Sequence, residues 1–171
     1  GYWKTYYPEG GLKSEGKRSD FSLDSVWAFY TKEAMLQERI SYVDGRRQGK
    51  TWVYRLGDLK SECDYQNDTL QGICIEYELF TAVREVPFVG GKQDGKGYSF
   101  NPVGDITAIL YFKTGFLRRS EEINRLDKLG RKQGSWKDFY DNRVLKTEGS
   151  YLDGQKHGLF KTYSPSGETL T

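Results

Sequence analysis

The sequence predicts an all-β protein, an elongated single-sheet meander of consecutive β-hairpins. Three observations lead to this prediction. A motif returns about every 24 residues, each period holds two turn signals, and the runs between those signals are about five to seven residues long. Runs of that length are typical of strands and too short for pairs of helices. Each period is therefore predicted to form one hairpin, which gives about fourteen strands in all.

The composition agrees with a folded chain whose interior is aromatic. The 171 residues include 13 Tyr, 9 Phe and 4 Trp, whose side chains bury large areas when they pack, and 20 Gly, which indicate frequent chain reversal. The formal net charge is only +2 and the basic residues form no stripe, so a nucleic-acid partner is not expected. No apolar run is long enough to predict a membrane-spanning helix.

The repeating motif is a small residue, a bulky residue two positions later and an aromatic residue three positions after that. Six copies are in phase: Gly1-Trp3-Tyr6, Ser25-Trp27-Tyr30, Gly49-Thr51-Tyr54, Gly72-Cys74-Tyr77, Gly134-Trp136-Phe139 and Gly158-Phe160-Tyr163. A degenerate copy begins at Gly97, with Phe100 as its bulky residue. Six copies in phase predict a repeat array rather than a chance match.

The array is predicted to be a single domain over residues 1–171. Its seven units lie near 1–24, 25–48, 49–71, 72–96, 97–133, 134–157 and 158–171, the last being partial. The fifth unit holds an insertion of about a dozen residues within "KTGFLRRSEEINRLDKLG". That insertion is interpreted as an extra strand pair or one short helix, with strands favoured.

Turn signals set a predicted register between neighbouring strands. "VDGRRQ", "QNDTLQ" and "LDGQKH" carry residue pairs that hairpin turns prefer. Symmetric pairing about these turns places Tyr42 opposite Gly49, Tyr65 opposite Gly72 and Tyr151 opposite Gly158, so that each ring covers a glycine. The alternative is that these glycines only relax the turns, because a two-residue turn shifts the register.

The same pairing places Cys63 directly opposite Cys74. A disulfide between them and a pair of buried free thiols are both left open, since the outcome depends on an oxidising compartment.

The unit "QGSWKDFYDNRVLKTEGSYLDGQKHG" resembles the MORN repeat, in the variant form that is common in bacteria and labelled antitoxin-like. The matching residues are Gly134, Trp136, Phe139, Tyr140, Val144, Leu145, Gly149, Tyr151, Gly154 and Gly158. The resemblance covers essentially the whole chain, best over 1–77 and 130–167. It implies an elongated, curved sheet of hairpins that acts in interaction or assembly, with membrane association proposed for some relatives. Because Thr51 and Cys74 replace the bulky aromatic residue in two units, a continuous aromatic groove is not expected.

No catalytic, metal or cofactor site is predicted. The single histidine, His157, stands where other units have Gln48, Gln71 and Gln133, so a role as general base is not expected. Two cysteines without further ligands do not make a zinc site. The run from Asp64 lacks the glycine and glutamate of a calcium loop, and "GGKQDGKG" lacks the spacing of a phosphate-binding loop.

These observations predict a non-enzymatic scaffold for protein–protein interaction or assembly with an unidentified protein partner. Surface binding of lipid headgroups or glycans at the cell envelope is the alternative, and self-association through the first and last strands is a further hypothesis. A bacterial cell envelope or secreted location is favoured. The candidate contact or core aromatics are Trp3, Tyr6, Trp27, Tyr30, Trp52, Tyr54, Trp136, Phe139, Phe160 and Tyr163.

Overall fold

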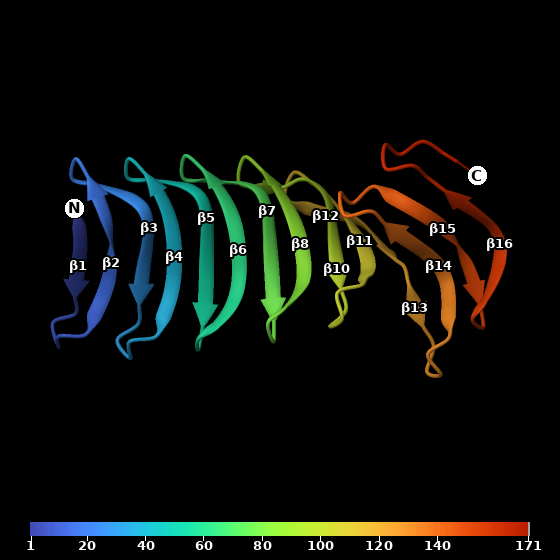
Figure 1. The fold of residues 1–171 in the computed structure, drawn as a ribbon, viewed down its shortest axis with the longest axis horizontal. Helices are drawn as coiled ribbons and strands as arrows, with labels where there is room; N and C mark the ends of the chain where they lie inside the picture. Colours follow the sequence, from blue (N-terminus) through green and yellow to red (C-terminus); the bar gives the residue numbers. More distant parts are fainter. Residues whose placement is uncertain (171) are drawn as a thin grey trace.

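A row of antiparallel strands makes up almost the whole molecule (Figure 1). The computed structural model describes residues 1–170, which hold sixteen strands and no helix. This confirms the predicted all-β meander of hairpins. The strands are β1 (Tyr2–Tyr6), β2 (Leu12–Ser19), β3 (Ser22–Tyr30), β4 (Leu36–Val43), β5 (Arg46–Arg55), β6 (Asp58–Gln66), β7 (Thr69–Glu78), β8 (Thr81–Val89), β9 (Lys92–Gln93), β10 (Gly95–Phe100), β11 (Ile106–Lys113), β12 (Phe116–Glu122), β13 (Arg125–Leu126), β14 (Lys132–Phe139), β15 (Leu145–Leu152) and β16 (Gln155–Thr162).

Two sheets divide these strands. A 12-stranded sheet, here called the large sheet, runs from β1 to β12 in chain order, with the short β9 pairing only to β8. The 4-stranded order β13-β14-β15-β16 forms the small sheet. Figure 1 shows the strands of the large sheet side by side along the long axis, with the small sheet at the C-terminal end. Each strand contacts its neighbours in sequence, as expected for a repeat array.

The turns differ between the two edges of the large sheet. One edge carries two-residue turns such as Asp44-Gly45 and Asn67-Asp68, in which both residues have positive φ. That conformation matches the twist of the flanking strands and favours Asn, Asp and Gly. The other edge carries longer turns, for example Thr31–Met35, which the Thr31 and Met35 backbones close by a hydrogen bond of 2.8 Å. It also carries the two-residue turns Leu56-Gly57 and Leu79-Phe80.

The two-residue turns shift the register from the one predicted. Tyr65 pairs with Leu70 on the next strand and with Gly49 on the preceding one, and it does not face Gly72. Gly72 lies instead in a β-bulge, between the pairs Cys63–Cys74 and Tyr65–Leu70. The predicted pairings of Tyr42 with Gly49 and of Tyr151 with Gly158 fail in the same way, and those glycines occupy equivalent bulges.

Positive φ explains the small residue that opens each unit. At the start of these units the residue lies in the left-handed region, where glycine has no steric cost. The positions are Ser25, Gly49, Gly72, Gly95, Gly134 and Gly158. In the fifth unit the residue is therefore Gly95, which lies 23 residues after Gly72, and not Gly97 as the sequence motif indicates.

One row of side chains crosses the large sheet near the middle of every strand. From strand to strand, the residues that lie side by side on one face are Trp3, Gly16, Trp27, Ile40, Thr51, Cys63, Cys74, Val86, Gly97, Leu110 and Ser120. We call this the central row and its side of the sheet the front face. Cys63 and Cys74 are disulfide-bonded within the row, with their Cα atoms 4.1 Å apart. The row is buried at Trp27, Ile40, Val86 and Leu110 although no second layer covers it.

The segment predicted as an insertion forms strands. β12 continues the large sheet, and after Ile123 and Asn124 the chain enters β13, which pairs with β14. This adds a single strand instead of a hairpin. As a result, the longer turn Tyr140–Val144 lies at the end of the strands where the large sheet has turns such as Asp44-Gly45. The two-residue turn Asp153-Gly154 lies at the opposite end, as Figure 1 shows.

The main apolar core lies where the two sheets meet. On the back face of the large sheet, Tyr98, Ile106, Ile109 and the fully buried Ile123 form one cluster. Phe139 of the small sheet packs against it, with its ring centroid 5.9 Å from that of Tyr98. A thin single-layer array thus becomes two-layered at this point.

Candidate interaction surfaces

The candidate aromatics divide between the two faces of the sheets. Trp3, Trp27, Trp136 and Phe160 hold the central-row position or its equivalent in the small sheet. Trp52 pairs with Arg39 and Glu62 and so lies on the back face. Because side chains alternate along a strand, the aromatic residue three positions after the bulky one also lies on the back face; this set is Tyr6, Tyr30, Tyr54, Phe139 and Tyr163. The ten residues therefore do not form one continuous surface.

Exposure separates these aromatics further. Trp27 is only 2% exposed, because its ring lies over Gly16 and its indole Nε1 donates to the Lys17 carbonyl at 2.7 Å. Trp3 and Tyr6, on the N-terminal strand, are 50% and 58% exposed. The remaining seven are half-buried. Trp27 is thus a core residue, whereas Trp3 and Tyr6 are available for contact.

A tyrosine–glutamate pair recurs on the back face at both ends of the chain. The Tyr30 hydroxyl donates to Glu15 Oε1 at 2.8 Å, and the Tyr163 hydroxyl donates to Glu148 Oε1 at 2.7 Å. The bond from Tyr30 lowers the pKa of the Glu15 carboxyl and raises that of the Tyr30 hydroxyl. These pairs hold neighbouring hairpins together, so the shifted pKa values mark structural contacts.

An aromatic pocket opens on the small sheet. Its volume is about 220 Å³, and its walls include the rings of Trp136, Tyr151 and Phe160. The Tyr151 ring makes edge-to-face contacts with the other two, with centroids 5.6 Å from Trp136 and 5.4 Å from Phe160. Since Phe139, on the opposite side of β14, packs into the core, the pocket faces away from the large sheet.

Lysines surround the rings of this pocket. Lys132 Nζ lies 4.1 Å from the centroid of Trp136, and Lys156 Nζ lies 4.7 Å from that of Phe160. Lys161 also lines the pocket, whose acidic side chain is Asp138. The Asp138 carboxylate accepts a hydrogen bond of 2.6 Å from the Thr147 hydroxyl. The pocket therefore combines apolar ring surfaces with a net positive rim.

The equivalent place at the N-terminal end of the large sheet is filled. There the Arg18 guanidinium stacks on both Trp3 and Trp27, 5.5 and 5.6 Å from their centroids. In the small sheet, Tyr151 occupies the repeat position equivalent to Arg18. The space beside the Tyr151 ring is open and forms the pocket. In addition, the buried Nε1 of Trp136 has no hydrogen-bond partner among residues 1–170, unlike that of Trp27. Three rings are thus available to a bound group.

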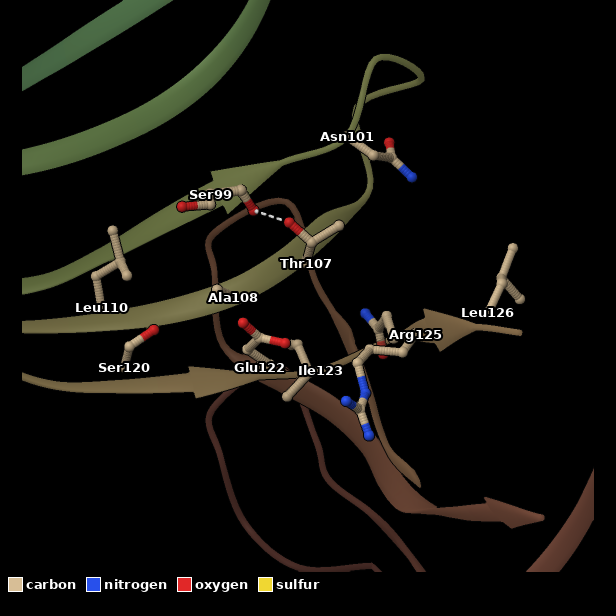
Figure 2. A pocket seen from close by; sticks show the side chains of 11 residues that line it. Ser99, Asn101, Thr107, Ala108, Leu110, Ser120, Glu122, Ile123, Arg125 and Leu126 are labelled. Carbon is tan, nitrogen blue, oxygen red and sulfur yellow. Dashed lines mark hydrogen bonds between the residues drawn. The ribbon is translucent and has the colours of Figure 1, made fainter. Parts of the chain in front are cut away.

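A second hollow, of about 590 Å³, lies on the front face where β12 ends. Figure 2 shows it beside β10, β11 and β12, with Leu110 and Ser120 at one end and Asn101 and Leu126 at the other. The Thr107 hydroxyl donates to the Ser99 carbonyl across it at 3.3 Å. Its lining is mixed and open, without a cluster of titratable groups that could act together.

Ion pairs tie the small sheet to the back face of the large one. Arg143 bonds Glu85 at 2.9 Å, and Lys137 bonds Glu121, which lowers the pKa of the Glu121 carboxyl. Lys96 lies between the Tyr98 and Phe139 rings, and burial lowers the pKa of its ammonium group. These ion pairs and ring contacts stabilise the junction of the two sheets.

The glutamines in register with His157 have structural partners. Gln48 and Gln71 accept hydrogen bonds from backbone N–H groups of the next two-residue turn, at Asn67 and Gly90. Gln133 instead donates through its Nε2 to the carboxylate of Asp153, in the turn Asp153-Gly154, at 3.0 Å. This position therefore braces the following turn. Within residues 1–170 no three His, Cys, Asp or Glu side chains gather as metal ligands, and no helix there is long and apolar enough to cross a membrane.

The sequence analysis missed most of the pocket. It named Trp136 and Phe160 as candidates. It considered Tyr151 for strand pairing and for the repeat resemblance but not as a contact residue, and it did not single out Lys132 or Lys156. The available signal was the internal match of residues 134–163 to residues 1–30, in which Tyr151 replaces Arg18. That replacement changes a filled stack into an open pocket.

A scan against models of protein families finds no match for this chain, and a comparison with curated protein sequences finds none either.

Proposed function

We propose that this chain is a non-enzymatic repeat scaffold that binds a partner protein, and that the aromatic pocket of the small sheet is a principal contact. The observation that carries the proposal is the outward-facing set of Trp136, Tyr151 and Phe160 with a basic rim. Tryptophan and tyrosine in a well-packed depression are typical of residues that dominate binding energy between proteins.

The rim chemistry indicates the kind of partner segment. Lys132 and Lys156 outnumber Asp138, while Lys161 pairs with Glu148 at 4.0 Å, so acidic side chains are attracted to the rim. A pocket of about 220 Å³ has room for one large apolar or aromatic side chain. The proposed ligand is therefore an acidic peptide segment with a central apolar or aromatic residue.

Peptide display tests this proposal. The whole chain is used to select from a library of random peptides, and a synthetic copy of the enriched peptide is titrated by calorimetry. Acidic peptides with an apolar residue are expected. The double variant K132E/K156E should weaken their binding by roughly tenfold or more, because two attractive charges become repulsive.

The control variant K13E/K92E reverses two exposed lysines of the large sheet, which do not line the pocket. It should bind as the unchanged protein does. Equal weakening by both variants, or no enrichment of acidic peptides, would contradict the proposal.

Glycan binding is the alternative that the same experiment separates. Three rings with hydroxyl and carboxylate neighbours also suit a neutral sugar. Neutral oligosaccharides that bind equally to both double variants would replace the peptide proposal, and salt-sensitive binding to anionic vesicles would favour lipid headgroups.

A further inference from the structure

Strand β12 is an internal free edge. It is the last strand of the large sheet and pairs only with β11. Six of its seven residues are exposed. The sequence predicted edges at the first and last strands of the array, whereas this edge lies in the middle of the chain and does not depend on where the chain begins or ends.

The edge exists because β14 leaves the plane of the sheet. The Asn124 N–H donates to the Ser135 carbonyl, which begins a pairing between the two strands. At the next position of this pairing, the Asn124 side chain replaces a backbone partner for β14. The Lys137 N–H donates to Asn124 Oδ1 at 2.8 Å, and Asn124 Nδ2 donates to the Lys137 carbonyl at 2.9 Å. Beyond this point β14 passes over the back face, where Arg143 reaches Glu85.

The place beside Ser120 and Glu122 in the plane of the sheet is therefore not taken by β14. Backbone polarity alternates along an antiparallel strand. Because the Ile123 N–H points to Thr107 on β11 and the Asn124 N–H points to β14, the N–H and C=O groups of Ser120 and Glu122 point away from β11. These groups are ready to pair with an added strand.

The order of charged residues along β12 indicates which strand would pair with it. Arg118 and Arg119 precede Ser120, and Glu121 and Glu122 follow it. We propose that β12 pairs antiparallel with β12 of a second copy of this chain, about a two-fold axis at Ser120. The edge then closes on itself, as isologous interfaces do.

This register places opposite charges together, with Arg118 as the extra residue of a β-bulge between Arg119 and Leu117. Ser120 faces Ser120 of the second copy, Arg118 faces Glu122 and Arg119 faces Glu121, each twice by symmetry. Arg119 already bonds Glu121 of its own strand at 2.7 Å, so Arg118 and Glu122 are the selective pair. A strand without this reversed order would leave these two charges unpaired or place like charges beside them, so the edge rejects it.

Charge exchange in the whole chain tests the proposal by sedimentation equilibrium. The unchanged protein is expected to show a concentration-dependent dimer. The single variants Arg118→Glu and Glu122→Arg should each dissociate at least tenfold more readily, because each brings two like-charge pairs together. The double variant R118E/E122R should dimerise again.

A mixture of the two single variants gives a sharper readout. One carries two glutamates and the other two arginines at the paired positions, so the mixture should form heterodimers while each variant alone stays monomeric. Ser120→Pro removes the outward N–H group, which an edge strand tolerates, and should give a monomer with an unchanged circular dichroism spectrum.

A wild-type monomer at every concentration up to the millimolar range would overturn the proposal. Dimers that persist in both single variants and in Ser120→Pro would also overturn it, and would assign self-association to another strand. The proposal does not rest on the pocket of the small sheet, whose test changes Lys132 and Lys156 instead.

Discussion

Gly16 and Gly149 show how a missing side chain positions a wide ring. A Cβ added at Gly16 would lie 2.5 Å from the Trp27 ring, and one added at Gly149 would meet Phe160 just as closely. Neither glycine has positive φ, so their conformation does not require glycine. The space under the ring requires it, because a close-packed interior has no room for an added methyl group.

Gly16→Ala is therefore expected to lower the free energy of unfolding by about 1–3 kcal/mol, through displacement of Trp27. Urea denaturation measures this change. Gly11→Ala is the matched control, since its nearest neighbour would lie at an ordinary 3.7 Å. Equal losses in the two variants would mean that the general cost of replacing glycine, and not the ring, decides the effect.

Residue-scale features were only partly predictable from the sequence. The six in-phase motifs correctly indicated that a small residue opens each unit, but not why. The bulge that demands positive φ became visible only with the register, and it identifies Gly95 as the fifth such residue. The sequence motif pointed to Gly97, which is instead a central-row residue whose Cβ would clash with the Glu85 carbonyl.

At the scale of elements, side-chain caps shape the longer turns. Asn101 Oδ1 accepts from the backbone N–H groups of Val103 and Asp105, and Asp127 Oδ1 accepts from those of Leu129 and Arg131. Amide and carboxylate oxygens thus close equivalent turns. The carboxylate differs in being charged, and the Arg131 N–H bond is the largest cause that lowers the pKa of Asp127 to about 2.

This lowered pKa predicts an acid-sensitive turn. Because the folded pKa lies below the unfolded value of about 3.9, the Asp127 contribution to stability is present above about pH 4 and is lost as pH falls through about 2. Carbon-13 NMR of the side-chain carboxyl should give a midpoint near 2. In Asp127→Asn, which keeps an oxygen acceptor as at Asn101, the stability difference from wild type should shrink between pH 4 and pH 2. A midpoint near 3.9 would contradict the capping account.

The sequence predicted the positions of the strands and turns but not the register between strands. Asp-Gly and Asn-Asp signals located the turns, and alternation located the strands. The predicted tyrosine–glycine pairs failed because a two-residue turn leaves Val43 opposite Arg46 and Tyr42 opposite Arg47, so the bulge must absorb the difference. Cys63 still faces Cys74 because the bulge lies between that pair and the turn.

At the scale of the molecule, Asn124 joins the two sheets. Its Nδ2 donates to Ile106 on β11 at 3.0 Å and to Lys137 on β14 at 2.9 Å, and its Oδ1 accepts from the Lys137 N–H. A single amide therefore satisfies backbone groups of both layers. Its φ of 57° bends the chain from β12 into β13.

Asn124→Ala should loosen this junction. Three hydrogen bonds are lost and the Lys137 backbone is left unpaired, which we expect to cost roughly 2–4 kcal/mol of unfolding free energy. Small-angle scattering should show a larger radius of gyration as the small sheet separates. Asn142→Ala removes an exposed asparagine from a turn of the small sheet and is the control. Unchanged scattering in both variants would show that Phe139 and Arg143 suffice to hold the sheets.

The repeat array was predictable at this scale, but its second layer was not. Periodicity specifies contacts between neighbouring strands, whereas the packing of Phe139 on Tyr98 joins residues 41 positions apart through a break in the period. The local sequence pattern of residues 113–130 does not indicate that the chain leaves the large sheet. Asn124 causes this change through hydrogen bonds to backbone groups, which a hydropathy pattern does not reveal.

The single strand added between Gly95 and Gly134 changes the parity of the array. With an even number of strands per unit, each edge would carry turns from the same half of every unit throughout. A ligand that contacts those turns could then extend its contact along the whole molecule. An odd number exchanges the edges after β12. Such a ligand would meet a boundary there, so one chain presents two differently oriented surfaces built from the same repeated hairpin.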